Sequence, residues 1–397
     1  MTSSILAATG HWTATGALPS ASSWYGQHDG AVLLTGGKVL VVGGAGPASG
    51  ALANAALFDP ATGKWTATAD LLNPRRLHTM TRLDDGKVLV TGGIGGSSAE
   101  FPAPGQATAE IYDPQAGTWK PTGSMQGPRW GHSAVLLPSK KVLVAGGATV
   151  RSGSSVKALR SAELYDPGTG KWTAAADMTD ARSGHPAVVL GNGRVLVCGG
   201  TAPIGRDEET ALAFCELYDE GQDAWTPTGS MLAPRARHQA TPVSTTALPV
   251  PKTAVLVTGG SPPGAPGDGT FDPFSRATAE LYDQATGAWT AAKSMPAGRG
   301  VHRAVPLGSG KVLVIGGADG VGNDAGFQSC LIYDSQADTW APAGGLATGR
   351  WAFAATALSG GGVLVTGGVV RSGLAAANPD GDELTTSTEI FSLGGTP

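Results

Sequence analysis

Residues 86–93 read Gly-Lys-Val-Leu-Val-Thr-Gly-Gly, and close variants of this octet recur along the chain. Each variant ends in a Gly-Gly pair. The first glycine of the pair falls at seven positions: 43, 92, 146, 199, 259, 316 and 367. The six intervals average 54 residues, and a self-similar period of this length predicts a repeat architecture rather than a set of unrelated domains.

A second phrase follows each Gly-Gly pair. It consists of an aromatic residue, usually an aspartate, a short turn and a tryptophan. The pairs are Phe58 with Trp65, Tyr112 with Trp119, Tyr165 with Trp172, Tyr218 with Trp225, Tyr282 with Trp289, and Tyr333 with Trp340. The seventh aromatic, Phe391, has no tryptophan after it, whereas Trp12 stands alone near the N-terminus. This asymmetry predicts that the N-terminal segment completes the last unit.

Each unit has the pattern of four short strands, a to d. In the second unit we expect strand a at about 78–83, b at 87–91, c at about 108–112 and d at 118–122. The b strands are runs of valine and leucine, which is typical of a strand buried on both faces. Turn residues such as Asp and Gly separate the strands. Four-stranded units with a period near 50 residues predict an all-β propeller.

Composition supports this prediction and excludes other classes. The chain has 397 residues, of which 61 are glycine and 15% are charged. Glycine lowers helix stability by about 1 kcal/mol relative to alanine, so a helical bundle is disfavoured. The net charge of −4 gives no basic footprint for nucleic acid. No apolar run approaches the roughly 20 residues of a membrane helix, so we expect no membrane partner.

The N-terminal residues and the cysteines indicate the cellular compartment. The first ten residues lack the basic and apolar regions of a secretory signal. Three cysteines do not make a disulfide framework and are expected to be buried free thiols. We therefore expect a cytoplasmic protein. Its low lysine content and its richness in alanine, glycine and threonine look bacterial.

The apolar strand ending in Gly-Gly, the Tyr-Asp pair and the following tryptophan together resemble the kelch-repeat β-propeller family, including bacterial single-domain kelch proteins. The resemblance covers about residues 11–393. It implies one seven-bladed antiparallel propeller over 1–397, with strand a innermost. The expected blades span about 26–68, 77–122, 131–175, 184–228, 237–292, 301–343 and 352–391, with 11–15 as strand d of the last. Closure of the ring in this way removes an open sheet edge.

Repeated polar residues are expected to serve the fold. Five histidines begin strand a after Arg-x-x: His78, His132, His185, His238 and His302. We expect each to form hydrogen bonds within its own blade, with a histidine metal site as a minor alternative. His28 lies near the equivalent place in the first blade. The arginines are expected to pair with a glutamate on strand c. Blades 1 and 6 lack that glutamate, which would leave an arginine there free to face a ligand.

Function is expected where the blades differ. The b–c connections span 13 to 22 residues and are unlike one another, and they emerge on the same face as the d–a connections. Variable loops on a rigid scaffold are common binding sites. We therefore predict a site at the channel mouth on this face. The candidate binding residues, all in or near d–a connections, are Trp24, Tyr25, Arg76, Trp130, Arg237, Arg303 and Trp351. The tryptophans are expected to be exposed enough to stack on a ligand or a partner.

Candidate catalytic residues are less well defined. Two acidic clusters on this face include Asp207 with Glu208 and Asp382 with Glu383, and His28 lies near the first inner strand. They could transfer protons or bind a hard metal ion, but neither acidic cluster has the spacing of a calcium loop. No phosphate-binding, zinc-protease or nucleophile-elbow motif is present. We predict no cofactor and assign no metal site.

Two functions remain open. One is a small-molecule site at the channel mouth, which in an enzyme would carry out cofactor-independent isomerase, cyclase or lyase chemistry. The alternative is a protein-interaction platform on the same face. Kelch-like propellers include substrate adaptors, sialic-acid mutarotases, iron-dependent specifier proteins and the copper domain of galactose oxidase. The propeller is expected to fill the chain, so no adaptor domain and no copper–radical site is carried over. The oligomeric state is not indicated.

Overall fold

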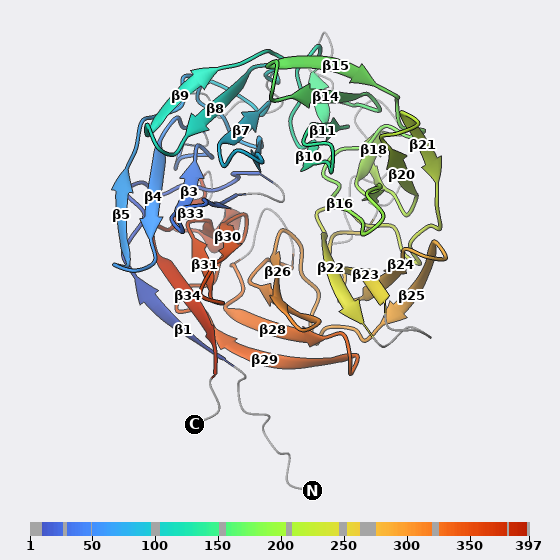
Figure 1. Cartoon of the computed structure of the whole chain (residues 1–397). Coiled ribbons are helices and arrows are strands. Elements are labelled where there is room, and N and C mark those ends of the chain that lie inside the picture. The colour runs from blue at the N-terminus through green and yellow to red at the C-terminus, as the bar shows by residue number, and fades with distance from the viewer. Residues whose placement is uncertain are drawn as a thin grey trace, which may run out of the picture.

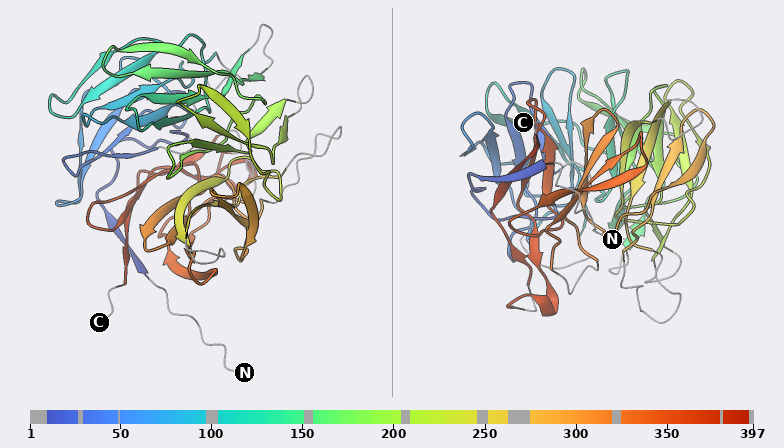
Figure 2. Two further views of the ribbon diagram at one scale, coloured as in Figure 1. Left: turned by 45° about the vertical axis from the view of Figure 1, so that its right-hand side comes forward. Right: turned by 90° about the horizontal axis from the view of Figure 1, so that it is seen from below.

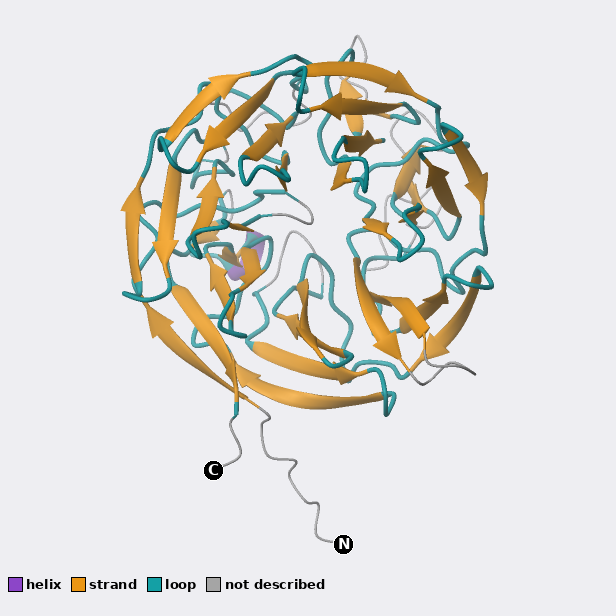
Figure 3. Cartoon of the chain, viewed as in Figure 1, coloured by secondary structure: helices purple, strands orange, loops and turns teal. Residues whose placement is uncertain are grey.

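The structure is a computed structural model, and it describes residues 10–26, 30–48, 50–96, 104–150, 156–203, 209–245, 252–262, 275–319, 325–378 and 381–394. Seven four-stranded antiparallel sheets stand around a central channel (Figure 1). Figure 3 shows strands and loops almost throughout, and the described residues contain one short 3-10 helix, η1 (Gly373–Ala375). The prediction of a seven-bladed all-β propeller is confirmed.

The first four blades follow one another along the chain, each running from the channel outward. Blade 1 has β2 (Val32–Leu33), β3 (Val39–Val42), β4 (Ala55–Asp59) and β5 (Lys64–Ala67). Blade 2 has β6 (Thr79–Arg82), β7 (Val88–Thr91), β8 (Ala109–Asp113) and β9 (Thr118–Pro121). Blade 3 has β10 (Ser133–Leu136), β11 (Val142–Ala145), β14 (Ala162–Asp166) and β15 (Lys171–Ala175). Blade 4 has β16 (Ala187–Val189), β17 (Val195–Cys198), β20 (Cys215–Asp219) and β21 (Ala224–Pro227).

The last three blades complete the ring. Blade 5 has β22 (Gln239–Thr245), β23 (Lys252–Thr258), β24 (Ala279–Asp283) and β25 (Ala288–Ala292). Blade 6 has β26 (Arg303–Gly308), β27 (Lys311–Ile315), β28 (Ser329–Asp334) and β29 (Thr339–Gly345). Blade 7 has β30 (Ala354–Ala357), β31 (Val363–Thr366), β34 (Thr388–Leu393) and, as its outer strand, β1 (Gly10–Thr15). The N-terminal strand thus closes the last blade as predicted.

Three b–c connections form small hairpins of their own. These are β12 (Ala148–Val150) with β13 (Val156–Ala158), β18 (Thr201–Pro203) with β19 (Glu209–Ala211), and β32 (Val369–Arg371) with β33 (Glu383–Leu384). In the side view of Figure 2, the chain near the C-terminal end (red) projects from one face of the ring. The described parts of these three b–c connections therefore extend blades 3, 4 and 7 with paired strands.

The outer strands join each blade to the one before it. Tyr165 of β14 lies opposite Trp172 of β15, with ring centroids 5.0 Å apart. The Trp172 indole donates a hydrogen bond of 2.7 Å to the Gly123 carbonyl of blade 2. Equivalent tryptophans in blades 2, 4, 5 and 6 also donate to a carbonyl of the preceding blade. The tryptophans are therefore between-blade contacts, as expected from their repetition.

The Gly-Gly pairs form the inner contact between blades. In blade 2 both Gly92 and Gly93 have positive φ, and the Gly93 N–H donates to the Arg129 carbonyl of blade 3 at 2.9 Å. A Cβ on Gly92 would lie 2.6 Å from that carbonyl oxygen and 2.6 Å from the His132 ring. Only glycine combines this conformation with such close approach.

Four of the five histidines bond across this contact rather than within their own blades, so for them that expectation was wrong. His132 Nε2 lies 3.0 Å from the Thr79 hydroxyl and 3.2 Å from the Thr91 hydroxyl, both in blade 2. The rings of His185 and His302 likewise meet a hydroxyl of the preceding blade. The physical reason is that the ring lies over the preceding Gly-Gly turn, so its far nitrogen reaches that blade's inner strands.

The arginines pair with glutamates as predicted wherever the glutamate exists. Five such pairs are almost fully buried, joining Arg75 with Glu110, Arg129 with Glu163, Arg182 with Glu216, Arg235 with Glu280, and Arg350 with Glu389. Each guanidinium also bonds to backbone carbonyls, as with Arg182 Nη1 to Gly199 at 2.9 Å. A buried ion pair is tolerated when its remaining donors are satisfied in this way.

The expectation that blade 6 leaves an arginine free was wrong. Arg299 is 1% exposed and bonds to the Gly316 and Ser329 carbonyls at 2.9 Å. Its guanidinium carbon lies 5.4 Å from the centre of the Phe327 ring. Burial lowers its pKa to about 10, yet the group stays charged at neutral pH. In blade 1 the arginine is replaced by Ser22, whose hydroxyl bonds to the Tyr25 hydroxyl.

Removal of the closing strand should strongly destabilise the ring. Deletion of residues 1–16 removes β1, and with it the contact between Trp12 and Phe391, whose ring centroids are 5.3 Å apart. We expect a loss of at least about 3 kcal/mol, the cost of losing one large packed side chain. Chemical denaturation measures it, and deletion of residues 1–8, which keeps β1 whole, is the control. Equal stability of the two truncations would contradict closure by β1.

A single methyl group in the blade contact should also be costly. In Gly147→Ala the new Cβ would lie 2.7 Å from the Trp130 carbonyl oxygen at a φ of 94°. We expect a loss of about 2–4 kcal/mol from steric overlap and left-handed strain. Gly36→Ala is the control, because nothing lies within 4 Å of the added carbon there. Unfolding curves that coincide for the two variants would rule out this account.

Buried histidines should make the fold acid-sensitive. Burial, assisted by the neighbouring Arg75 charge, lowers the pKa of His78 to about 3. The unfolded chain therefore binds more protons below about pH 6.5, and stability falls as the pH drops through that value towards 3. Blade 7 already has Phe353 at this position. We expect His78→Phe to recover up to about 2 kcal/mol at pH 5.

The matched variant for this test is His132→Phe. It also removes a titrating ring, but it breaks the bonds to Thr79 and Thr91, so it should lose stability at pH 8. His78 Nε2 has no hydrogen-bond partner among the described residues, so His78→Phe should change stability little at pH 8. The measurement is unfolding free energy at pH 8 and pH 5, and an unchanged pH dependence in both variants would exclude His78 and His132 as its source.

Candidate functional site

A closed ring of backbone hydrogen bonds surrounds the channel where the d–a connections enter strand a. In each blade, the residue before the buried imidazole or aromatic donates its N–H to the equivalent carbonyl of the preceding blade, at 2.8 to 3.4 Å. All seven of these residues have φ between 49° and 61°. They form what we call the mouth ring: Trp24, Leu77, Gly131, Gly184, Arg237, Val301 and Ala352. The ring closes because blade 1 bonds to blade 7.

The ring corrects one sequence assignment. In blade 1 the residue that follows the mouth ring is Tyr25, so Tyr25 and not His28 takes the place of the imidazole. Tyr25 is fully buried in the blade core, and burial raises the pKa of its phenol. His28 itself lies outside the described residues, as do Asp207 and Glu208.

In each blade, the residue that precedes the mouth-ring residue in sequence has the same backbone contact but a side chain whose type varies among the blades. This residue bridges, antiparallel, to the residue after the Gly-Gly pair. We call the seven the bridge positions: Ser23, Arg76, Trp130, Ser183, Ala236, Gly300 and Trp351. Two serines, an arginine, an alanine, a glycine and two tryptophans thus share one backbone geometry. Side chains at these positions are therefore not dictated by the fold.

The mouth ring and four bridge positions enclose a cavity of about 410 Å³, which we call the mouth chamber. It lies on the face of the b–c and d–a connections, where a site was predicted. The described residues that line it are Trp24, Gly26, Arg76, Leu77, Trp130, Gly131, Ala148, Val156, Ser183, Gly184, Thr201, Ala236, Arg237, Gln239, Val301, Arg303 and Ala352. A volume of this size suits a small organic ligand.

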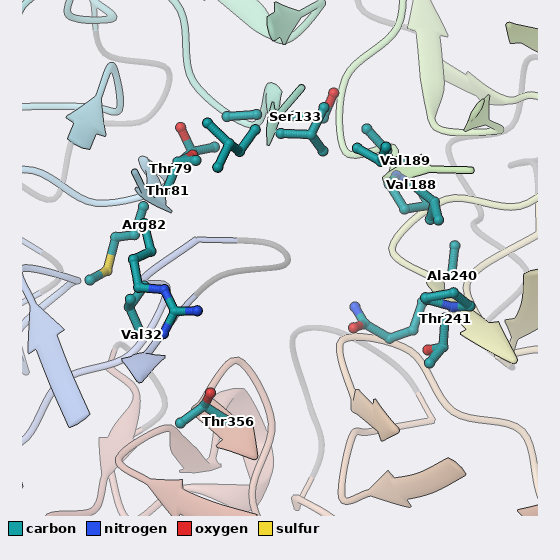
Figure 4. A pocket seen from close by; sticks show the side chains of 18 of the residues that line it. Val32, Thr79, Thr81, Arg82, Ser133, Val188, Val189, Ala240, Thr241 and Thr356 are labelled. Atoms are coloured by element: carbon teal, nitrogen blue, oxygen red, sulfur yellow. The ribbon is translucent and has the colours of Figure 1, made fainter. Parts of the chain in front are cut away.

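A second cavity of about 590 Å³, the inner chamber, lies further along the channel between the innermost strands. Figure 4 shows Thr79, Thr81 and Arg82 on one side of it and Val188 and Val189 on the other. Its described lining is mostly aliphatic and hydroxyl-bearing side chains, and Arg82 is the charged residue among them. Gln239 lines both chambers, so it lies at their junction. The two tryptophans of the lining belong to the mouth chamber alone.

Five of the seven candidate binding residues line the mouth chamber: Trp24, Arg76, Trp130, Arg237 and Arg303. Trp130 is 4% exposed and so forms a wall rather than an open stacking surface. Trp351 is also buried, against expectation, and it packs edge-on against Trp24 with ring centroids 5.2 Å apart. Trp351 therefore supports a lining residue without reaching the chamber itself.

The three lining arginines differ in their partners. Arg303 is held by the Phe353 carbonyl at 2.8 Å and the Gly26 carbonyl at 2.6 Å. Arg237 is exposed and has a partner of its own. Arg76 is 8% exposed, and its buried Nη2 has no hydrogen-bond partner among the described residues. Burial lowers the pKa of Arg76, and no carboxylate opposes that effect.

Of the acidic candidates, Asp382 lies beside the chamber and Glu383 does not. The half-buried Asp382 carboxyl is hydrogen-bonded to the Trp24 side chain, and burial raises its pKa. Glu383 lies 3.7 Å from Arg371 and accepts a bond of 2.5 Å from the Ala377 N–H. The two adjacent carboxyl groups thus contact different residues, and Asp382 is the one that contacts a lining residue of the chamber, Trp24.

The described residues do not fit a metal ion. No three His, Cys, Asp or Glu side chains among them are grouped to hold one. Three of the repeated histidines have Nε2 bonded to a hydroxyl of the preceding blade, so these rings do not converge on a common point. No reaction step through a metal follows from this donor set. Within the same residues, no helix is long and apolar enough to cross a membrane.

Sequence reasoning missed the uncharged part of the lining, including Ser183, Thr201 and Gln239. The Ser183 and Thr201 hydroxyls are hydrogen-bonded to each other at 2.9 Å. The signal that finds such residues is positional rather than chemical. They occupy the bridge position of blade 4 and its bridging partner after Gly200, so the repeats must be aligned at single-residue precision to show them.

Comparisons with known proteins agree with the propeller fold. Residues 76–126 match the family model described as the Kelch motif. Kelch-like protein 25 of Rattus norvegicus is 30% identical over 279 residues, which cover 68% of this chain and 41% of the relative. The chain thus spans about two fifths of the length of that relative.

Two solved structures share the fold. One, titled as a novel fungal alcohol oxidase of the AA5 family in complex with copper, has a TM-score of 0.67 and 18% identity. The alignment covers 97% of this chain and 76% of the oxidase. The other, YjhT, has a TM-score of 0.56 and 16% identity, with 79% and 94% covered. At these identities the likeness extends to the propeller architecture and no further.

Proposed function

We propose that this chain, which belongs to the kelch-repeat β-propellers, binds a small molecule in the mouth chamber. The observation that carries the proposal is a 410 Å³ cavity enclosed where the blades differ in side chain but not in backbone. Trp24, Trp130 and Leu77 supply apolar walls, and hydroxyls and guanidinium groups supply directed polar contacts. A mostly apolar cavity with a few convergent polar groups is the usual form of a ligand site.

The rigidity of the walls favours binding. The mouth ring holds seven lining residues by backbone hydrogen bonds from blade to blade. A ligand that enters therefore does not have to order a loop, and the conformational entropy cost of binding is reduced. This applies to the described lining residues, most of which belong to the ring or to the bridge positions.

Catalysis at this chamber would need a group that transfers protons. Asp382 is the catalytic candidate that we retain, because its carboxyl contacts Trp24 and burial raises its pKa. An isomerase, cyclase or lyase that needs no cofactor would be consistent with one such acid beside bound substrate. The proposal for binding does not depend on this step.

A protein-interaction platform on the same face is the alternative function. Among the described residues, Leu374 on η1 is the exposed large apolar side chain that lies in a b–c connection. A single exposed leucine is ordinary for a protein surface. The enclosed chamber therefore gives the small-molecule proposal the stronger physical support.

Ser183→Trp should block the site without disturbing the fold. Trp130 and Trp351 occupy the equivalent bridge positions of other blades, so this backbone accommodates tryptophan. The added indole would fill part of the mouth chamber. We expect compounds that stabilise the unmodified chain in a thermal-shift screen of metabolites to lose at least about tenfold in affinity, equivalent to 1.4 kcal/mol.

The control is Thr226→Trp, on the exposed outer strand β21. It adds the same side chain far from the channel and should leave binding unchanged. Titration calorimetry on the compounds found in the screen gives the affinities. Binding that survives Ser183→Trp intact would place the site elsewhere. A screen with no binder, by thermal shift or native mass spectrometry, would count against a small-molecule function.

A further inference from the structure

Arg76 is the buried arginine of the mouth chamber whose side chain forms no hydrogen bond with a described residue. Its neighbour in sequence, Arg75, pairs with Glu110 at 2.7 Å and with the Gly92 carbonyl at 2.7 Å. The Arg76 side chain, in contrast, has no hydrogen bond to any described residue, and its Nη2 is buried. Of two arginines adjacent in sequence, Arg75 thus has hydrogen-bond partners within the fold and Arg76 has none among the described residues.

An unbalanced buried cation is costly. Removal of a guanidinium from water without a counter-ion destabilises a protein by several kcal/mol at full burial, and less where some solvent contact remains. A guanidinium cannot lose its proton to avoid this cost, because its pKa stays far above neutrality. A side chain placed in this way is expected to have a partner in the functional state. That partner should enter the chamber from solution.

The surroundings define the charge of the missing partner. Among the described residues, no Asp or Glu lines the mouth chamber. Arg237 and Arg303 also line it, so three guanidinium groups face the chamber, while the Asp382 carboxyl lies outside the lining against Trp24. The net potential inside is therefore positive. Both of these arginines have other interactions, which leaves Arg76 as the donor available to a ligand. The partner is therefore an anion.

The lining also defines the type of anion. One uncommitted guanidinium matches a single negative charge, and its parallel N–H groups fit the two oxygens of a carboxylate. The remaining walls are largely apolar, with Trp130 4% exposed beside Arg76 in the ring order and Leu77 next to it in the chain. A carboxylate attached to an aromatic or aliphatic body would satisfy both regions of the chamber.

From this arrangement we infer that the ligand of the mouth chamber is a small organic carboxylic acid, bound through its carboxylate to Arg76 with its apolar body against Trp130 and Trp24. The inference rests on the proposed function and specifies its ligand class. Ser183 and Thr201, whose hydroxyls already bond to each other, lie on another part of the same wall and can accept polar substituents.

The test compares pairs of probes that differ in charge alone. Benzoate and indole-3-acetate are titrated against the full chain beside benzamide and indole-3-acetamide, with phenyl phosphate as a second anion. We expect the carboxylates to bind at least tenfold more tightly than their amides, since a hydrogen bond to a charged group contributes more than a neutral one. This comparison uses the unmodified protein, so it does not depend on how any variant folds.

The variant Arg76→Gln removes the charge and keeps a polar side chain of similar reach. It should reduce carboxylate affinity to the level of the amides and leave the thermal stability of the ligand-free chain unchanged or higher. Arg82→Gln is the control, since Arg82 lines the inner chamber and bonds to the Leu33 carbonyl at 2.7 Å. It changes net charge equally and should leave carboxylate binding as it was.

Three results would overturn the inference. Equal affinity for carboxylates and amides would remove the charge requirement, and full binding by Arg76→Gln would remove Arg76. Tighter binding of phenyl phosphate than of benzoate would change the ligand class. In each case the proposed function would still stand if neutral compounds bind the unmodified chain and lose that binding in Ser183→Trp. Failure of every probe, charged or neutral, would count against both proposals.

Discussion

The rest of the structure depends on the contact between the Gly-Gly turn of one blade and the Arg-x-x segment of the next. The second glycine donates its N–H to the arginine carbonyl, and the first has no room for a Cβ. The chain direction at this contact fixes where the next inner strand begins. A histidine ring then covers the turn and reaches the preceding blade. Because each contact joins neighbours in the ring, small errors in angle would accumulate over seven blades and prevent closure.

Closure has a consequence at the channel mouth. The residue before each imidazole has a left-handed φ, and it donates to the equivalent residue one blade earlier. Glycine holds this conformation in blades 3 and 4, but Trp24, Arg237 and Val301 hold it elsewhere. Non-glycine residues in this region carry strain that the surrounding structure must offset. Here the ring of hydrogen bonds constrains the backbone, so the side chain at each position is left free to vary.

Sequence reasoning identified most of the scaffold because the repeated residues are few and regularly spaced. Seven Gly-Gly pairs, the Tyr–Trp pairs and the lone Trp12 were sufficient to predict the number of blades and the closing strand. It failed where a contact crosses from one blade to another. The histidine partners, the buried Arg299 and the position of Tyr25 depend on how blades pack, and no periodicity within one chain segment encodes that. At the site, residue chemistry pointed to Trp24, Arg76 and Trp130, whereas uncharged lining such as Ser183 required the alignment of backbone positions.

The mouth chamber shows how the same scaffold separates stability from recognition. Each buried Arg-x-x-His arginine has its glutamate or a set of carbonyls, so its charge belongs to the fold. The bridge positions lie one residue further along, with the backbone equally constrained, and in four blades they line the mouth chamber. Arg75 and Arg76 illustrate this difference. They are adjacent in sequence, but the Arg75 side chain pairs with Glu110 inside the blade and the Arg76 side chain lines the mouth chamber. A charge that the fold neither requires nor neutralises is best explained by a ligand, and the apolar walls around Arg76 limit that ligand to an anion with an apolar body.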